Sequence, residues 1–238
     1  MKKIIFLTGI AFVLFSCNSG SKESSGMGSE IESTKKIKAI NNVSYDCLKK
    51  HQDDYQSLLT KEEMASVYPI DFTNAKEELR AGSYGEYIFM WPSDRPDVDL
   101  EISGMKIKNP DKNTMGIKNL KFISDKTDME SAISTFNMAY KELSDEELEK
   151  IQANLNKQSD DIKSAGKNLM KVRARVHWDF VDDLGSSAWY KWNETYGGEL
   201  AVLAGKAKFY IVLKISSNPN ENRKLAIQLA NKVLAKCE

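Results

Sequence analysis

Apolar positions with helical spacing begin near residue 44 and predict short helices at the start of the folded region. Tyr55 and Leu58 fit this spacing. Thr60-Lys61-Glu62-Glu63 then has the spacing of a capping box, in which each end residue's side chain binds the other's backbone N–H. Pro69 lacks the N–H that a helix interior needs. We therefore expect a helix to begin after Thr60 and to end before Pro69.

Alternation at every second position predicts three strands in the next stretch. Residues 84–91 carry large apolar side chains on both faces, which is typical of a central strand. Residues 98–102 alternate apolar and polar side chains, and residues 115–123 form the third predicted strand. Asp128 then caps a predicted helix that reaches residue 143.

The second half of the chain begins with a polar helical pattern. Ser144-Asp145-Glu146-Glu147 repeats the capping-box spacing, and a narrow apolar line continues to Leu169. Most other positions are charged or amide residues, so this helix is expected at the surface. A break is expected around Ser159 or Gly166.

Strand patterns return after this helix. Residues 176–180 alternate, and residues 200–203 and 208–215 form a predicted hairpin about Gly205. Asn220 is the expected cap of a last amphipathic helix.

Both halves, 44–143 and 144–238, thus show the order helix, about three strands, helix. The fold class predicted is α+β, with antiparallel sheet packed with helices on one side. Two interpretations stay open: a duplication into two similar helix–three-strand–helix halves, or one α+β domain whose elements recur.

The N-terminus has the pattern of an export signal. Lys2 and Lys3 precede an apolar segment, Ile4–Phe15, of twelve residues. This segment is shorter than the about 20 apolar residues that cross a bilayer, and as a helix it spans only about 18 Å. Residues 1–16 are therefore predicted to be a cleaved signal peptide.

Leu14-Phe15-Ser16-Cys17 closes this segment and resembles the lipobox of bacterial lipoproteins. The resemblance implies that the Cys17 thiol receives a diacylglyceryl group, that cleavage precedes Cys17, and that the new amine is acylated. Two or more acyl chains give stable anchoring. The alternative is an ordinary signal peptide with an incidental cysteine.

Residues 17–43 are rich in Ser, Gly, Lys and Glu and predict a lipidated flexible tether with a reach of about 25 Å. The signal holds two of the 34 basic residues and none of the 34 acidic ones, which leaves 32 against 34, a net charge of −2. This balance excludes a nucleic-acid footprint and a polybasic membrane surface. Asn18 after the cysteine is not an aspartate, which by resemblance to proteobacterial sorting permits delivery to the outer membrane. The lack of an acidic cluster after it favours a periplasm-facing location over the cell surface.

If lipid occupies Cys17, Cys47 and Cys237 remain as an even pair in an oxidising compartment. A disulfide between them would close almost the whole folded region, for which chain-entropy estimates give at most about 5 kcal/mol. The alternative is two unpaired thiols.

Asp46-Cys47 followed by Leu58–Met64 resembles the opening of uncharacterised actinobacterial envelope lipoproteins, which begin with a cysteine and a leucine-threonine-acidic helix. Further matches follow in that family's order at Asp183–Trp189, the Gly205 hairpin and Leu225–Leu234. Ser186 replaces the family's aspartate. The resemblance spans most of residues 46–237 and implies a fold. It implies no activity, because that family's own role is not established.

Catalytic signatures are missing from the sequence. His51 and His177 have no HExxH, HxxxH or CxxC companion, and no nucleophile elbow or phosphate-binding loop occurs. We therefore expect no enzyme activity, metal or cofactor. The alternative is a hydrolase of envelope glycans or lipids, which would use His177, Asp182, Asp183 and Glu199 if two of them met in one pocket.

Aromatic residues are crowded near the end of the chain. Trp189, Tyr190, Trp192 and Tyr196 form the candidate binding surface, with Trp178 close by in sequence. Outward aromatic side chains could stack on a sugar or anchor a partner protein. The alternative is that they fill the core. The expected function is a membrane-anchored envelope lipoprotein that binds an envelope protein or glycan without catalysis, or one that supports an assembly.

Overall fold

The fold was analysed in a computed structural model that describes residues 45–102, 104–173 and 176–237. The predicted signal peptide, Cys17 and the tether lie outside the described residues.

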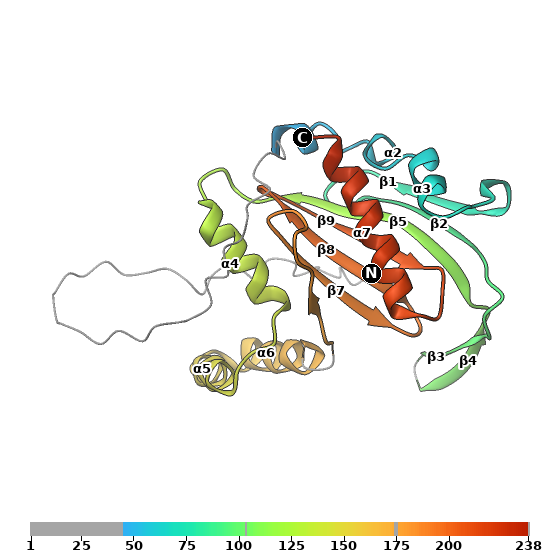
Figure 1. Cartoon of the computed structure of the whole chain (residues 1–238). Coiled ribbons are helices and arrows are strands. Elements are labelled where there is room, and N and C mark those ends of the chain that lie inside the picture. Colours follow the sequence, from blue (N-terminus) through green and yellow to red (C-terminus); the bar gives the residue numbers. More distant parts are fainter. Residues whose placement is uncertain (1–44, 103, 174–175, 238) are drawn as a thin grey trace, which may run out of the picture. The chain divides into compact units, whose positions relative to one another are not determined.

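One antiparallel sheet of seven strands organises the described chain (Figure 1), which confirms the predicted fold class. From one edge to the other, its strands are β1 (Lys76–Arg80), β2 (Glu86–Pro92), β5 (Lys112–Phe122), β9 (Ala207–Lys214), β8 (Gly197–Ala204), β7 (Ser187–Asn193) and β6 (Asp179–Phe180). The predicted central strand is β2, and β1 was not predicted because its sequence, KEELR, is mostly charged.

One face of the sheet, here the α7 face, carries the main core. It is covered by α7 (Pro219–Ala235) and by the N-terminal helices α1 (Tyr45–Lys49), α2 (Tyr55–Leu58) and α3 (Lys61–Val67). A 3-10 turn, η1 (Phe72–Asn74), links them to β1. Leu200, Val202 and Phe209 pack there against Leu229 of α7. All four side chains are fully buried, so this face is closed to water.

The opposite face, here the α4 face, is covered in part by α4 (Met129–Tyr140). Phe136 and Tyr140 of α4 pack on Ala201 and Leu203 of β8. The prediction that all helices lie on one side is therefore wrong. The physical reason is that β8 is apolar at consecutive positions, so that both of its faces need cover.

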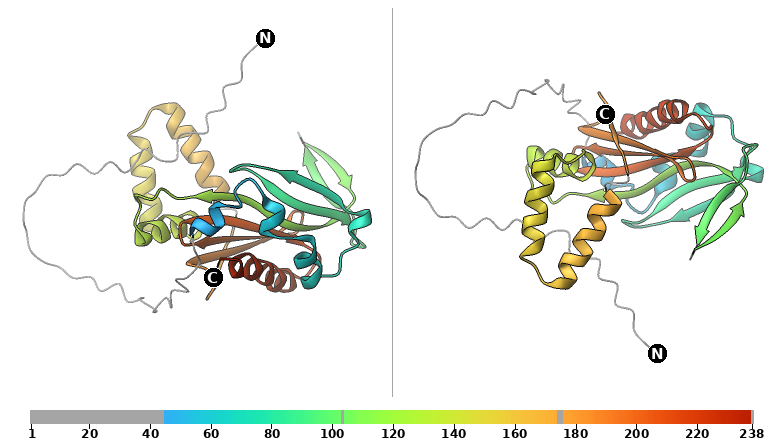
Figure 2. Two further views of the ribbon diagram at one scale, coloured as in Figure 1. Left: turned by 90° about the horizontal axis from the view of Figure 1, so that it is seen from above. Right: turned by 90° about the horizontal axis from the view of Figure 1, so that it is seen from below.

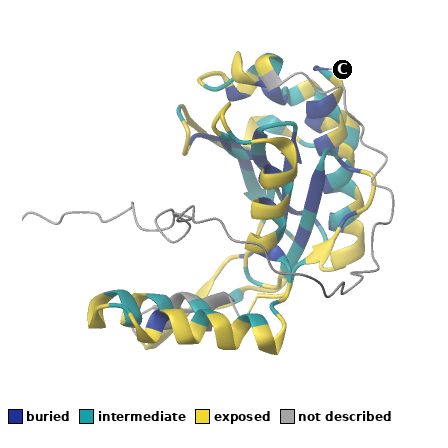
Figure 3. Ribbon diagram, turned by 90° about the vertical axis from the view of Figure 1, so that its left-hand side faces the viewer, coloured by how far each residue is buried: buried dark blue, intermediate teal, exposed yellow. Residues whose placement is uncertain are grey.

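The long polar pattern of the second half forms two helices, α5 (Asp145–Asn156) and α6 (Asp160–Arg173). The expected break near Ser159 is confirmed. Figure 3 shows the pair at the bottom of the view, with α5 exposed along most of its length. A Cβ atom on Gly166 would come 2.3 Å from the end of the Leu155 side chain, so that side chain would have to shift to admit a larger residue there.

The halves 44–143 and 144–238 match in one respect and differ in another. Each places its strands in chain order from an edge of the sheet to the centre, where β5 pairs with β9. Their last helices, α4 and α7, cover opposite faces. A two-fold axis that relates the antiparallel strands β5 and β9 is perpendicular to the sheet, so it would place both last helices on the same face. The two halves therefore repeat the order of their strands but not the face on which the last helix packs.

Three predicted helix starts are confirmed by their capping contacts, and one is corrected. Thr60 and Ser144 each form a capping box, and Asp128 caps α4. The last helix begins two residues earlier than predicted, because Asn218 caps it and Pro219 follows at its first turn.

Two short strands lie outside the main sheet. The predicted strand at residues 98–102 is β3 (Val98–Ile102), and among the described strands it pairs only with β4 (Met105–Asn109). This hairpin continues beyond the ends of β2 and β5 and projects from the body (Figures 1 and 2). Strand β4 was not predicted, because its apolar residues alternate with lysines in too short a run.

Cys47 in α1 and Cys237 after α7 lie at the two ends of the described chain. Their sulfur atoms are 2.08 Å apart, at bonding distance across 190 residues of sequence. This is the arrangement that the predicted disulfide requires, and it would join the first and last helices of the α7 face.

Candidate binding face

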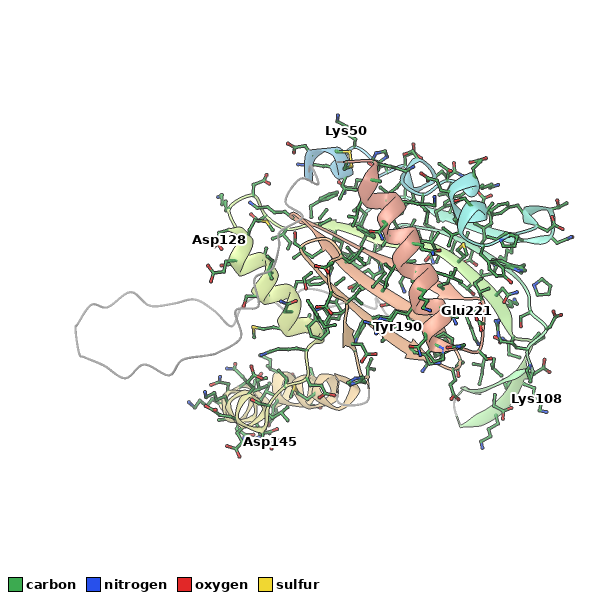
Figure 4. The ribbon with its side chains drawn as sticks, viewed as in Figure 1. Lys50, Lys108, Asp128, Asp145, Tyr190 and Glu221 are labelled. Atoms are coloured by element: carbon green, nitrogen blue, oxygen red, sulfur yellow. A yellow bond between two sulfur atoms is a disulfide. The ribbon has the colours of Figure 1, made fainter. Side chains whose placement is uncertain are left out.

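The structure does not bring the four predicted aromatic residues together on one surface. Trp189 points to the α4 face, whereas Tyr190 and Trp192 point to the α7 face. Tyr190 is only 2% exposed, lies beside α7 (Figure 4), and donates a hydrogen bond to the Pro219 carbonyl over 3.2 Å. Tyr196, in the turn between β7 and β8, is 77% exposed. Strand alternation separates neighbours along β7, so Tyr190 belongs to the core.

Trp189 is fixed in place by α4. Its indole N–H donates to the Asn137 side-chain oxygen over 2.9 Å, and the Ser187 hydroxyl donates to the same oxygen over 2.5 Å. Phe180 packs edge-on against its ring. The amide of Asn137 therefore joins α4 to two residues of β7, and it leaves the indole of Trp189 half-buried rather than free to move.

Beside Trp189, aromatic rings and charges alternate in a row across the α4 face. Lys191 lies over the Trp178 ring, with its ammonium 4.7 Å from the ring centre, and it also pairs with Glu199 over 3.5 Å. Glu199 accepts from Lys118 over 2.8 Å. We call Trp178, Lys191, Glu199, Lys118 and Tyr210 the aromatic-charged row.

Tyr210 closes the row from strand β9. The ammonium groups of Lys118 and Lys208 lie 6.0 and 5.5 Å from its ring centre, within the range of cation–π attraction. Its hydroxyl is 2.6 Å from that of Tyr140 at the end of α4. Burial, followed by the neighbouring Tyr210, raises the pKa of Tyr140, so the Tyr140 hydroxyl stays protonated.

A cavity of about 240 Å³ lies next to the row, where the α4–α5 link and the two following helices meet the start of β6. Tyr140 lines it and also packs against Trp178, with ring centres 4.6 Å apart. The cavity and the row therefore lie next to each other, with Tyr140 between them. The other lining residues are Lys141, Glu142, Leu143, Leu148, Met170, Val176 and His177.

His177 stands at the rim of this cavity between two carboxylates. Its Nδ1 is 2.7 Å from Glu142 and its Nε2 is 3.1 Å from Asp179. Hydrogen bonds with Glu142 and then Asp179 raise the pKa of His177. With both ring nitrogens engaged by carboxylates, the imidazole joins the α4–α5 link to β6.

The residues suspected in a hydrolase are dispersed. Asp182 and Asp183 are exposed in the turn after β6, and Asp183 has a positive φ of 56°. Glu199 is held by two lysines in the row. Of the four suspects, only His177 lines the cavity. Within the part of the chain that the structure describes, no three His, Cys, Asp or Glu side chains are grouped as a metal site would need.

Sequence reasoning missed most of the row. Lys118, Lys191 and Tyr210 come from three strands that are distant along the chain, and no motif links them. A signal was nevertheless present, because Lys191 stands between two tryptophans and Lys208 lies two positions before Tyr210. In a strand, residues two apart share a face.

A scan of family models finds none that fits this chain, and neither the curated proteins nor the solved structures include a match. No described helix is long and apolar enough to cross a membrane.

Proposed function

We propose that this chain is a lipid-anchored lipoprotein of the bacterial envelope, whose folded domain binds a ligand without catalysis. The apolar segment that ends at Cys17 carries the proposal, because it has the length of a cleaved signal and ends in a lipobox-like sequence. The tether at residues 17–43 would then hold the domain near the bilayer. The near-neutral charge leaves the lipid as the membrane attachment, with the periplasmic side of the outer membrane as the location.

The aromatic-charged row is the ligand-binding part of this proposal. Trp178 and Tyr210 offer apolar rings, and the charged groups of Lys191, Glu199 and Lys118 lie between them. A glycan fits this combination, since its C–H faces can pack on rings while its hydroxyls reach both donors and acceptors. An envelope protein is the alternative ligand.

The anchor is tested by growing cells with labelled palmitate. The wild-type chain should carry the label, and Cys17→Ala should lose it. The matched control, Cys17→Ala with Ser19→Cys, keeps a cysteine two positions downstream of the lipobox and should also remain unlabelled. Label on either variant would show that Cys17 is not the attachment site.

Ligand binding is tested by calorimetry with soluble N-acetylglucosamine oligomers. Tyr210→Ala should weaken binding by at least about tenfold, which corresponds to about 1.4 kcal/mol. Tyr196→Ala removes an exposed tyrosine outside the row and should leave the affinity unchanged. If the wild type does not bind these oligomers, the glycan is the wrong ligand. A partner protein captured from detergent-solubilised membranes by the wild type, and lost with Tyr210→Ala, would then favour the alternative.

A further inference from the structure

The β3–β4 hairpin is an arm that carries exposed apolar side chains. It forms its own two-stranded sheet, and no other described strand pairs with it. Met105 is 63% exposed and Ile107 is 43% exposed. An isolated two-stranded sheet is marginally stable in water, and exposed apolar side chains add to that cost. We therefore expect the exposed apolar side chains of the arm to be covered when the protein functions.

The register of the arm separates apolar from charged residues. Leu100 lies opposite Ile107, and residues opposite each other in an antiparallel pair share a face. Val98 and Met105 belong to the same face by strand alternation. Asp99 lies opposite Lys108, and both belong to the other face of the arm. The Lys108 side chain extends away from the body in Figure 4. One face is thus apolar and the other is charged with balanced signs.

A buried cluster of charges fixes the base of the arm. Asp111, where the chain re-enters the sheet, accepts from Arg95 and from Lys214, each over 2.6 Å. Arg95 also donates to the Ile215 carbonyl over 2.6 Å, and Lys214 donates to the Thr195 carbonyl over 2.9 Å. Buried ion clusters contribute little net stability, and their best-attested role is to specify one arrangement. Here the cluster joins Arg95, just before β3, and Asp111, just after β4, to Lys214 of β9.

Two modes of contact between the arm and a protein are unfavourable. Edge-to-edge pairing of two β4 strands would bring Lys106 and Lys108 of two copies together, and charged edges of this kind discourage strand addition. Face-to-face packing would use four partly exposed side chains. A specific protein interface buries about 800 Å² on each partner, which takes roughly 20–30 residues a side rather than four.

We propose that the apolar face of the arm inserts into the lipid surface to which the chain is anchored. Apolar side chains at this surface leave water, while the charged face, which carries Lys106 and Lys108, stays on the water side. Insertion of so few side chains is weak in solution, and it becomes effective when a tether keeps the arm near the bilayer. This last step rests on the proposed anchoring at Cys17.

The experiment uses the lipidated full-length protein reconstituted in phosphatidylcholine vesicles that contain a lipid with a quencher on its acyl chain. Met105→Cys supplies one reactive thiol for an environment-sensitive fluorophore, since Cys47 and Cys237 are paired and Cys17 carries lipid. The matched control is Leu79→Cys, because Leu79 is also exposed, at 49%, but lies on edge strand β1.

The expected result is a shift of emission to shorter wavelength and loss of fluorescence for the label at position 105, with neither change at position 79. Adding Ile107→Asp should restore the fluorescence at position 105. Phosphatidylglycerol in the vesicles should change little, because Asp99 offsets Lys108 and the net charge of the arm is small. Strong dependence on this anionic lipid would mean that charge, rather than apolar insertion, holds the arm.

Failure of the arm and failure of the anchor give different results. Protein that floats with the vesicles but keeps an unquenched label at position 105 overturns the insertion. A spectral shift that depends on protein density, without quenching, would show that a second copy covers the arm, and it also overturns the insertion. If the protein does not float, the anchoring is wrong. In that case the arm is tested with Cys17→Ala protein that an N-terminal histidine tag holds to vesicles containing a nickel-chelating lipid, where an unquenched label at position 105 overturns the insertion.

Discussion

The two faces of the seven-stranded sheet come from the same strands but differ in what covers them. On the α7 face, helices from both ends of the described part of the chain bury an apolar core that includes Phe209 and Leu229. On the α4 face, one helix covers part of the sheet, and the remainder holds paired charges beside aromatic rings, as at Lys118 and Tyr210. The comparison indicates that the α7 face maintains the fold, while the α4 face has side chains with which to bind a ligand.

The largest expected effect comes from neighbouring residues on β9 that point to opposite faces. Phe209→Ala should lower the free energy of unfolding by about 3–5 kcal/mol, because it empties a fully buried site on the α7 face. Tyr210→Ala should cost about 1–2 kcal/mol, since its ring is already partly exposed. Urea unfolding of the two variants measures both values. Equal losses would mean that the α4 face is as much a structural core as the α7 face.

A medium effect is expected where α4 meets the sheet. Asn137→Ala removes the acceptor of both the Trp189 indole and the Ser187 hydroxyl, which should cost about 1–3 kcal/mol. Near-ultraviolet circular dichroism should also report a change around Trp189. Asn154→Ala, at an exposed position of α5, is the matched control and should stay within about 0.5 kcal/mol of the wild type. A similar loss in both would count against a specific role for Asn137.

The smallest effect concerns the two histidines, which should titrate on opposite sides of 6.5. Hydrogen bonds with Glu142 and Asp179 raise the pKa of His177, whereas burial and then Lys236 lower the pKa of His51. The stability from His177 is fully present below pH 6.5 and is lost as the pH rises through its raised folded pKa. The stability effect is small because His177 is exposed.

Proton NMR of the imidazole C–H signals checks this pair directly. Glu142→Gln should lower the pKa of His177, because the variant loses the carboxylate nearest to its ring, and it should leave the titration of His51 unchanged. If the two histidines titrate together in the wild type, the contacts of His177 do not form in solution.

Local signals in the sequence identified several elements correctly. The capping boxes at Thr60 and Ser144 depend on residues three apart, so they could be recognised without tertiary contacts. The hairpin about Gly205 was also predicted, and Gly205 adopts a φ of 54° that favours glycine. In contrast, the mostly charged β1 was missed, because it forms by pairing along the edge of β2.

The candidate site was less predictable. Sequence crowding grouped Tyr190 with Trp189, but strand alternation sends adjacent side chains to opposite faces. The row that replaces this group joins β5, β7, β8 and β9, and strand pairing alone brings its charges together.

The sequence by itself determined three of the four predicted helix caps, the strongly alternating strands, the mixed antiparallel fold class and the prediction of an anchor at Cys17. Each depends on residues that are close along the chain. Only the tertiary structure decided that α4 and α7 cover opposite faces, that Tyr190 is buried, and that Arg95, Asp111 and Lys214 meet at the base of the arm. These features depend on which face a strand presents and which distant segment it pairs with, and local periodicity carries neither piece of information.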